Sequence, residues 1–176
     1  GNDLKNAEIE FGVALKLGPG LYPARTGQGY VAMAMRDYDR ALTAFDAALQ
    51  GEAAYVPALV GRGQALLARD RTDLALAAFE KALAIDPSLT DLSRRVEVLR
   101  FRNVQDVIEV AQVAAREGRA DDARRAYERA IAISPDSAFL YRELGQLERR
   151  AGNADRALER LGRAVELDPN DAVAPV

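Results

Sequence analysis

The chain has 176 residues, a formal net charge of −3, and neither cysteine nor histidine. It can therefore form no disulfide, no zinc site of the usual Cys/His type and no histidine general base. The charge gives no general attraction to nucleic acid or to an anionic membrane, and no segment approaches the ~20 apolar residues of a transmembrane helix. We accordingly expect no enzymatic activity, no metal site, no cofactor, no nucleic-acid partner and no membrane insertion.

One spaced pattern, Ala-x3-Phe-x2-Ala followed by a proline, occurs five times along the chain. Tyr or Leu replaces the Phe in the last two copies, and Ala53 replaces the proline of the second copy. The copies begin at intervals of 34, 34, 48 and 34 residues, at Ala7, Ala41, Ala75, Ala123 and Ala157. Repetition at this period is typical of a solenoid, in which each unit buries its apolar face against its neighbours.

The first predicted element is a single helix at about residues 3–17, which Gly18-Pro19-Gly20 ends. Each later unit predicts two antiparallel helices, because apolar and small residues recur at three- and four-residue steps and turn residues interrupt them midway. The second helices are expected at roughly 38–50, 72–85, 120–133 and 154–167. Asp37, Thr72 and Asn153 are the expected N-caps, since their side-chain oxygens can accept hydrogen bonds from first-turn amides.

Small residues recur at one register of the first helices, where two helices must approach closely; they are Gly29, Gly63, Ala111 and Gly145. Bulky residues recur on the second helices, at Phe11, Phe45, Phe79, Tyr127 and Leu161. A glycine inside a helix costs about 1 kcal/mol relative to alanine, so its recurrence indicates a packing requirement. We expect a large residue at Gly63 or Gly145 to force the helix pair apart.

These positions resemble the tetratricopeptide repeat (TPR), whose pattern combines a Leu-Gly pair, an aromatic residue, Ala-x3-Phe and Pro. The last unit matches at Leu144-Gly145, Ala157, Leu161, Ala164 and Pro169, and the second at Gly63, Leu66, Ala75, Phe79, Ala82 and Pro87. The usual Trp is absent, and Gln28 and Arg62 replace the leucine before glycine. The resemblance implies an all-α fold, a right-handed superhelical array of antiparallel helix pairs (a TPR-type α-solenoid).

The resemblance divides the chain into a half repeat, four full repeats, an insertion and a tail. The half repeat, a second helix alone, covers residues 1–20, and the tail covers 172–176. The full repeats cover 21–54, 55–88, 104–137 and 138–171, and the inserted helical segment covers 89–103. Since the pattern opens inside a repeat, we expect the natural chain to extend before Gly1; the sequence predicts no localisation.

The insertion predicts one long helix, because the chain contains no Gly or Pro between Ser88 and Glu117. Fourteen extra residues are close to four turns, so an apolar stripe can continue from the insertion into the next unit. We expect the first half to cover the preceding helix pair and the second half to act as the first helix of the next repeat. Two short helices with a break near Arg102-Asn103 are the alternative. Phe101 lies off the stripe and is a candidate for a second contact.

In the tetratricopeptide repeat family the first helices line a concave surface that holds peptides or partner helices. The resemblance therefore implies a non-enzymatic scaffold that binds a protein or peptide in this groove. The expected groove residues are Tyr30, Met33, Gln64, Leu67, Ile108, Gln112, Arg116, Phe139, Arg142, Gln146 and Arg149. Glutamine amides can donate to and accept from a peptide backbone. The apolar N-terminal part and the arginines of the C-terminal part predict a ligand with an apolar segment and an acidic portion.

Two other functions fit the pattern. In the first alternative, the chain is an accessory segment of a larger enzyme or sensor whose chemistry lies outside this segment. In the second, the chain assembles with copies of itself through its open ends. The second alternative rests on apolar candidates of the last helix, Leu158 and Val165, because exposed apolar faces favour association.

Overall fold

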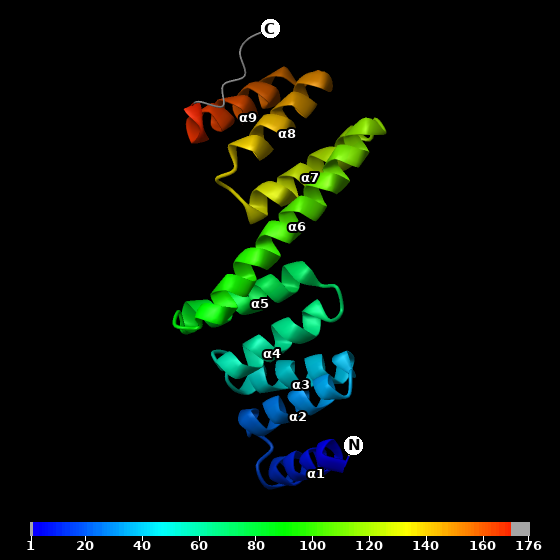
Figure 1. Ribbon diagram of the computed structural model, residues 1–176, viewed down its shortest axis with the longest axis vertical. Helices are drawn as coiled ribbons and strands as arrows, with labels where there is room; N and C mark the ends of the chain where they lie inside the picture. Colours follow the sequence, from blue (N-terminus) through cyan, green and yellow to red (C-terminus); the bar gives the residue numbers. More distant parts are fainter. Residues whose placement is uncertain (1, 170–176) are drawn as a thin grey trace. The chain divides into compact units, whose positions relative to one another are not determined.

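A computed structural model gives the fold of the chain and describes residues 2–169. These residues form nine α-helices and no strand (Figure 1), which confirms the predicted all-α fold. The helices are α1 (Asn2–Leu17), α2 (Tyr22–Ala34), α3 (Tyr38–Gly51), α4 (Val56–Leu67), α5 (Thr72–Ile85), α6 (Thr90–Arg116), α7 (Ala120–Ile133), α8 (Ala138–Arg150) and α9 (Ala154–Leu167). The chain divides between Leu99 and Arg100 into two compact units. The expected tail at 172–176 and the end of the last repeat lie outside the described residues.

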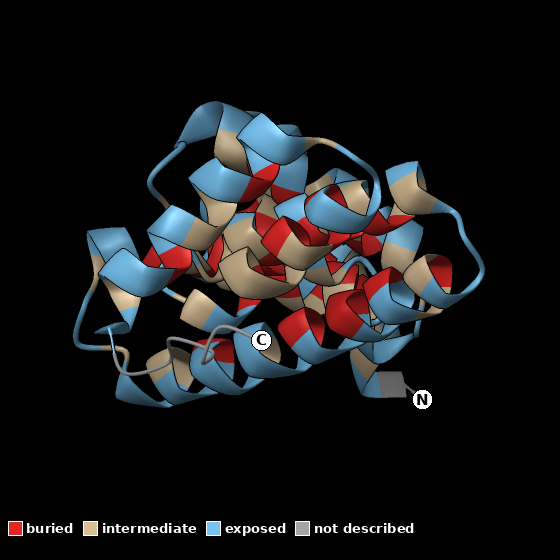
Figure 2. Cartoon of the chain, turned by 90° about the horizontal axis from the view of Figure 1, so that it is seen from above, coloured by how far each residue is buried: buried red, intermediate tan, exposed pale blue. Residues whose placement is uncertain are grey.

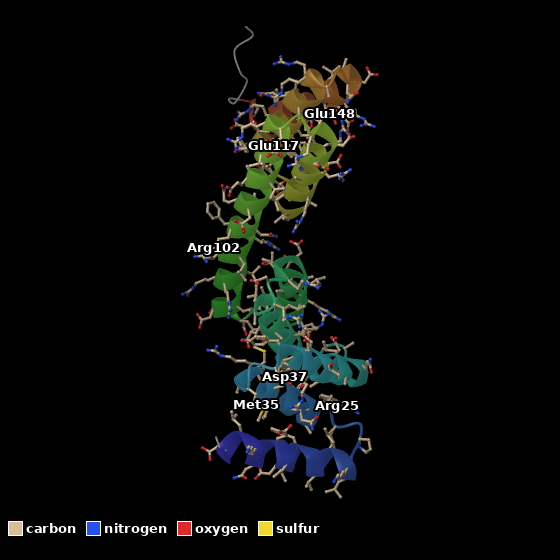
Figure 3. The ribbon with its side chains drawn as sticks, turned by 90° about the vertical axis from the view of Figure 1, so that its right-hand side faces the viewer. Arg25, Met35, Asp37, Arg102, Glu117 and Glu148 are labelled. Atoms are coloured by element: carbon tan, nitrogen blue, oxygen red, sulfur yellow. The ribbon has the colours of Figure 1, made fainter. Side chains whose placement is uncertain are left out.

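The ends of the second helices agree closely with the sequence. Helices α3, α5, α7 and α9 begin at the predicted residues, and only α3 ends one residue later than expected. Asp37, which is labelled in Figure 3, caps α3 as predicted, because its carboxylate accepts a hydrogen bond from the backbone N–H of Arg40 at 3.1 Å. Such a cap satisfies one of the amides that a helix start leaves without an intrahelical partner.

Thr72 is not an N-cap, and the prediction is wrong at this position. It is the first residue of α5, while Arg71 holds the N-cap position and makes no side-chain cap. The turn before it explains the difference: Asp70 adopts a left-handed φ of 56°, and the Arg71 N–H bonds to the Leu66 carbonyl at 2.9 Å. That bond fixes Arg71, and not Thr72, at the helix start.

Two buried phenyl rings organise the core of the first unit. Phe45 and Phe79 are both 0% exposed. A Cβ atom on Gly29 would lie 2.5 Å from the Phe45 ring, and one on Gly63 would lie 2.3 Å from the Phe79 ring. Both distances are far below van der Waals contact, so the recurrent glycines let the first helix approach the ring, as the sequence predicted. Figure 2 shows the buried residues, in red, gathered toward the middle of the view, with exposed residues in pale blue around them.

Helix α6 is continuous from Thr90 to Arg116, without a break at Arg102-Asn103, and Figure 1 shows it in green as one unbroken ribbon. Its first part packs Val96 into the core of the first unit, beside Phe79. Its second part contributes Val107 and Ala111 to the core of the second unit. One apolar stripe thus serves two cores, which is the double role expected from its spacing.

The second unit is held by a buried ion pair between α7 and α8. The Glu148 side chain is only 3% exposed (its position is labelled in Figure 3), and the Arg124 guanidinium donates to both carboxylate oxygens, at 2.6 and 3.2 Å. Asn153, a predicted cap, holds the N-cap position of α9 without a side-chain cap, because its amide donates to Glu148 at 2.6 Å instead. The Arg124 hydrogen bonds hold the pKa of Glu148 below its ordinary value, against burial, which raises it.

Gly63→Gln is expected to lower the free energy of unfolding by about 2 kcal/mol, since overpacking typically costs 1–3 kcal/mol. Urea unfolding followed by far-UV circular dichroism measures the change. The control is Gly162→Gln on α9, where an added Cβ atom meets nothing within 4 Å. There the better helix propensity of Gln is expected to raise stability by roughly 0.5 kcal/mol. Equal shifts at the two sites would contradict the packing role of Gly63.

Glu148→Gln is expected to destabilise the chain by about 2 kcal/mol at neutral pH, because a hydrogen bond to a charged group contributes roughly 1.5–3 kcal/mol. Glu148 has a lowered folded-state pKa, so its contribution is present above the ordinary glutamate value of 4.5 and is lost as pH falls through the folded-state value. The difference between wild type and variant should therefore shrink in acid. A difference that stays constant down to acidic pH would show that the charge of Glu148 is not the stabilising feature.

Candidate functional site

A cavity of about 560 Å³ opens between α6 and α8, entirely within the second unit. We call it the α6–α8 groove. Helix α6 supplies one wall, the turn between α7 and α8 supplies part of the other, and α8 supplies an aromatic ring. The lining residues are Phe101, Val104, Gln105, Asp106, Ile108, Glu109, Gln112, Ser134, Ser137 and Phe139.

The floor of the groove is apolar and belongs to the core. Val104 and Ile108 are each 9% exposed and pack in the same buried cluster as Leu140 and Leu144 of α8. They lie one helical turn apart on α6, so they face the same side of that helix. The floor is therefore part of the core that α6, α7 and α8 share.

The rim of the groove is formed by exposed side chains of α6. Phe101, Gln105 and Gln112 lie at steps of four and seven residues, within one stripe of the helix beside Ile108. Glu109 and Asp106 follow farther around the helix, away from the core, and all five are exposed. A segment bound in the groove would meet an aromatic ring, two amides and two carboxylates along one helix.

Phe139 stands on the opposite side, at the start of α8. Pro135 follows the end of α7, and Ser137 holds the N-cap position of α8. Leu140, the next residue after Phe139, is 0% exposed, which anchors this first turn in the core and leaves the Phe139 ring 37% exposed. The Arg142 guanidinium carbon lies 5.5 Å from the centre of that ring, a cation–π contact.

The charge of the groove is negative. Its charged lining residues are Asp106 and Glu109, and no lysine or arginine lines it. Among the described residues, neither carboxylate has an ion-pair or hydrogen-bond partner. Some carboxylates elsewhere in the unit are paired, as Glu117 is with Arg119 at 2.5 Å.

The structure brings together three of the groove residues that the sequence predicted, Ile108, Gln112 and Phe139. Two more lie beside them: Arg142 contacts the Phe139 ring, and Arg116 donates through Nε to the Gln112 carbonyl at 3.3 Å. Gln146 and Arg149 lie on α8 and do not line the groove.

The predicted groove residues of the first unit lie in other surroundings. Gln64 lines a separate cavity of about 480 Å³ between α4 and the first turns of α6. The Tyr30 hydroxyl donates to the Pro57 carbonyl at 2.8 Å. Burial is the larger cause that raises the pKa of Tyr30, and the charge interaction with Tyr55 is the smaller one. Met33 and Leu67 are half-buried against the two clusters of that unit.

Sequence reasoning missed the acidic and amide side of the groove. Gln105, Asp106 and Glu109 were not assigned to the groove, and Phe101 was given only as a candidate for a second contact. The signal was present in the helical register: Phe101 lies two turns before Ile108 and three before Gln112. Counting that register back into the insertion would have placed Phe101 and Gln105 in the groove.

Residues 2–169 contain no helix long and apolar enough to cross a membrane. In the same part of the chain, no three or more His, Cys, Asp or Glu side chains gather as metal ligands would. The fold and the groove instead define a helical-repeat protein of the class that presents binding surfaces between successive helix pairs.

Two family profiles, both described as Tetratricopeptide repeat, match the sequence at residues 26–89 and 106–170. Together they span more than half of the chain, and the chain belongs to the tetratricopeptide repeat family. Proteins of this family are generally non-enzymatic interaction scaffolds. No curated protein sequence matches the chain.

Several solved structures are similar to the chain in fold. The TPR domain of P58(IPK) has a TM-score of 0.56 at 19% identity, covering 96% of this chain and 47% of that one. A tetratricopeptide repeat protein from Parabacteroides merdae has a TM-score of 0.53 at 19% identity, covering 94% and 73%. MamA has a TM-score of 0.48 at 20% identity, covering 97% and 92%. The first two likenesses support the fold, and at this identity they say nothing about ligands.

Floor and rim residues of the groove should differ in their effect on stability. Ile108→Ala is expected to cost about 2–4 kcal/mol, because it opens a cavity in the core. Phe101→Ala is expected to stay within about 0.5 kcal/mol, because the ring is 67% exposed. Urea unfolding of both variants measures the difference. A large loss of stability in Phe101→Ala would mean that this ring has a structural role.

Proposed function

We propose that the α6–α8 groove binds a peptide or a helix of a partner protein, and that the chain acts as a non-enzymatic interaction scaffold. The observation that carries the proposal is the pair of exposed phenyl rings, Phe101 at 67% and Phe139 at 37%, on either side of a buried apolar floor. Aromatic side chains, phenylalanine included, are enriched at protein interfaces relative to the rest of the surface.

The size and chemistry of the groove support this function. A cavity of about 560 Å³ lies within the range of ligand sites, roughly 300–1,000 Å³. Gln105 and Gln112 add side-chain amides, which can donate to and accept from a peptide backbone without demanding a particular sequence. Apolar anchoring by the rings and backbone contacts by the amides together suit an elongated protein segment.

The test is a selection of random peptides displayed on phage with the immobilised chain, followed by fluorescence polarisation of the recovered peptides. Phe101→Ala with Gln112→Ala is expected to weaken their binding about tenfold or more, since a truncated aromatic anchor typically costs ~2 kcal/mol. Leu158→Ala with Gln50→Ala is the matched control, because both residues are exposed and lie outside the groove. Circular dichroism should stay helical in both variants.

Two outcomes would contradict the proposal. Recovered peptides that bind the groove variant as tightly as wild type would place binding elsewhere, and a selection that recovers no binding peptide would count against peptide recognition by this chain.

Self-assembly and an accessory role in a larger protein stay alternative proposals. Leu158 and Val165 of α9 are 75% and 49% exposed, which favours self-association over the accessory role. Light scattering over a concentration series measures self-association, and a monomer at every concentration would exclude self-assembly.

A further inference from the structure

The charge of the α6–α8 groove differs from what the sequence predicted. An acidic ligand was expected because Arg116, Arg142 and Arg149 are on the same helices. None of these arginines lines the groove. Arg142 lies over the Phe139 ring, and Arg116 donates to the backbone carbonyl of Gln112. Arg116 and Arg142 therefore stand beside the groove, and the charged side chains that line it are carboxylates.

The groove instead offers two carboxylates. Asp106 and Glu109 line it, are exposed, and have no ion-pair or hydrogen-bond partner among the described residues. Several other acidic side chains of the second unit are engaged by arginines, as Asp122 is by Arg119 at 2.8 Å, whereas Asp106 and Glu109 also share one cavity. Two unpaired carboxylates in one cavity leave a negative potential that a cationic group of a partner can complement.

The exposed aromatic ring beside them favours the same kind of partner. Phe101 is 67% exposed and lines the same cavity. The face of a phenyl ring attracts a lysine ammonium or an arginine guanidinium, and the attraction grows as the pair is shielded from water. A cationic side chain in the groove could thus contact a ring and a carboxylate at once, while the apolar floor of Val104 and Ile108 remains for a neighbouring apolar side chain.

We propose that the occupant of the groove is a basic protein segment, in which a lysine or arginine stands next to a large apolar or aromatic side chain. The inference rests on the proposed function and specifies its ligand. The apolar side chain lies on the floor between Phe101 and Phe139, and the cation lies between the Phe101 ring and the carboxylates of Asp106 and Glu109. Because these carboxylates are exposed, their effect is on selectivity and association rate.

The test compares two phage-displayed peptide libraries, which share a central Phe or Leu and differ only in having Lys/Arg or Asp/Glu at the flanking positions. Recovered peptides are synthesised in both charge forms and measured by fluorescence polarisation at low and high salt. Wild type is expected to prefer the basic form about tenfold at low salt, and less at high salt, because salt screens exposed charges. Asp106→Lys with Glu109→Lys is expected to reverse the preference.

Glu128→Lys with Asp155→Lys is the matched control, since it makes the same charge change at exposed positions of the second unit outside the groove. This variant should keep the basic preference. A preference for acidic peptides, no charge preference, or a basic preference that survives Asp106→Lys with Glu109→Lys would overturn the inference.

The outcomes separate this inference from the proposed function. If basic and acidic forms bind equally and Phe101→Ala with Gln112→Ala weakens both, the groove binds peptides and only the charge assignment is wrong. If neither library yields a binding peptide, the proposed function fails together with the inference.

Discussion

Contact between a glycine on one helix and a phenyl ring on the following helix holds the pairs α2–α3 and α4–α5 of the first unit together. Phe45 and Phe79 are buried completely, and each occupies the volume that a Cβ atom of Gly29 or Gly63 would need. Close packing of this kind transmits even small changes of volume, because protein interiors contain few voids. In the second unit, Gly145 of α8 meets the Leu161 side chain of α9 in the same way. There α6 and α7 instead bring Ala111 and Tyr127 into one core, and a buried Arg124–Glu148 ion pair joins α7 to α8.

The α6–α8 groove follows from this packing. Leu140 and Leu144 of α8 share one buried cluster with Ile108 of α6, and Phe139, the residue before Leu140, lines the same cavity as Phe101. The site is thus rigid at its floor and open at its edge, and its binding residues are separate from those that hold the fold. Such separation lets rim residues change without loss of stability, which is how repeat proteins of one fold can serve different ligands.

Much of the fold could be predicted from the sequence, because its signals are local. Helix ends follow from proline and turn residues, and the close approach of helices follows from the register of Gly29 and Gly63. Thr72 was placed wrongly because the helix start was set by the left-handed conformation of Asp70, which residue type alone does not reveal. Asn153 does not cap α9 with its side chain, because its amide donates to Glu148 instead. The sequence alone could not show this, because the burial of Glu148 depends on the tertiary fold.

The candidate site could be predicted only in part, for a related reason. Ile108, Gln112 and Phe139 were found from the repeat register, which places them on the first helices of their repeats. The acidic rim was missed because the insertion was treated as a separate segment, although α6 carries the same register through it. The predicted glutamine row is divided in the structure, since Gln64 lines one cavity, Gln112 lines another and Gln146 lines neither of them.

Continuity of α6 also has a consequence for how the chain unfolds. In most repeat arrays, neighbouring units are coupled through side-chain contacts, and local opening can stop at a loop between them. Here the backbone hydrogen bonds of one helix continue past Leu99 and Arg100, where the two units meet in sequence. When α6 unfolds from either end, one unit consequently loses its α6 core residues first. Further unfolding along the same helix then reaches the α6 core residues of the other unit. We therefore expect the unfolding of the two units to be coupled through the backbone hydrogen bonds of α6 as well as through side-chain contacts.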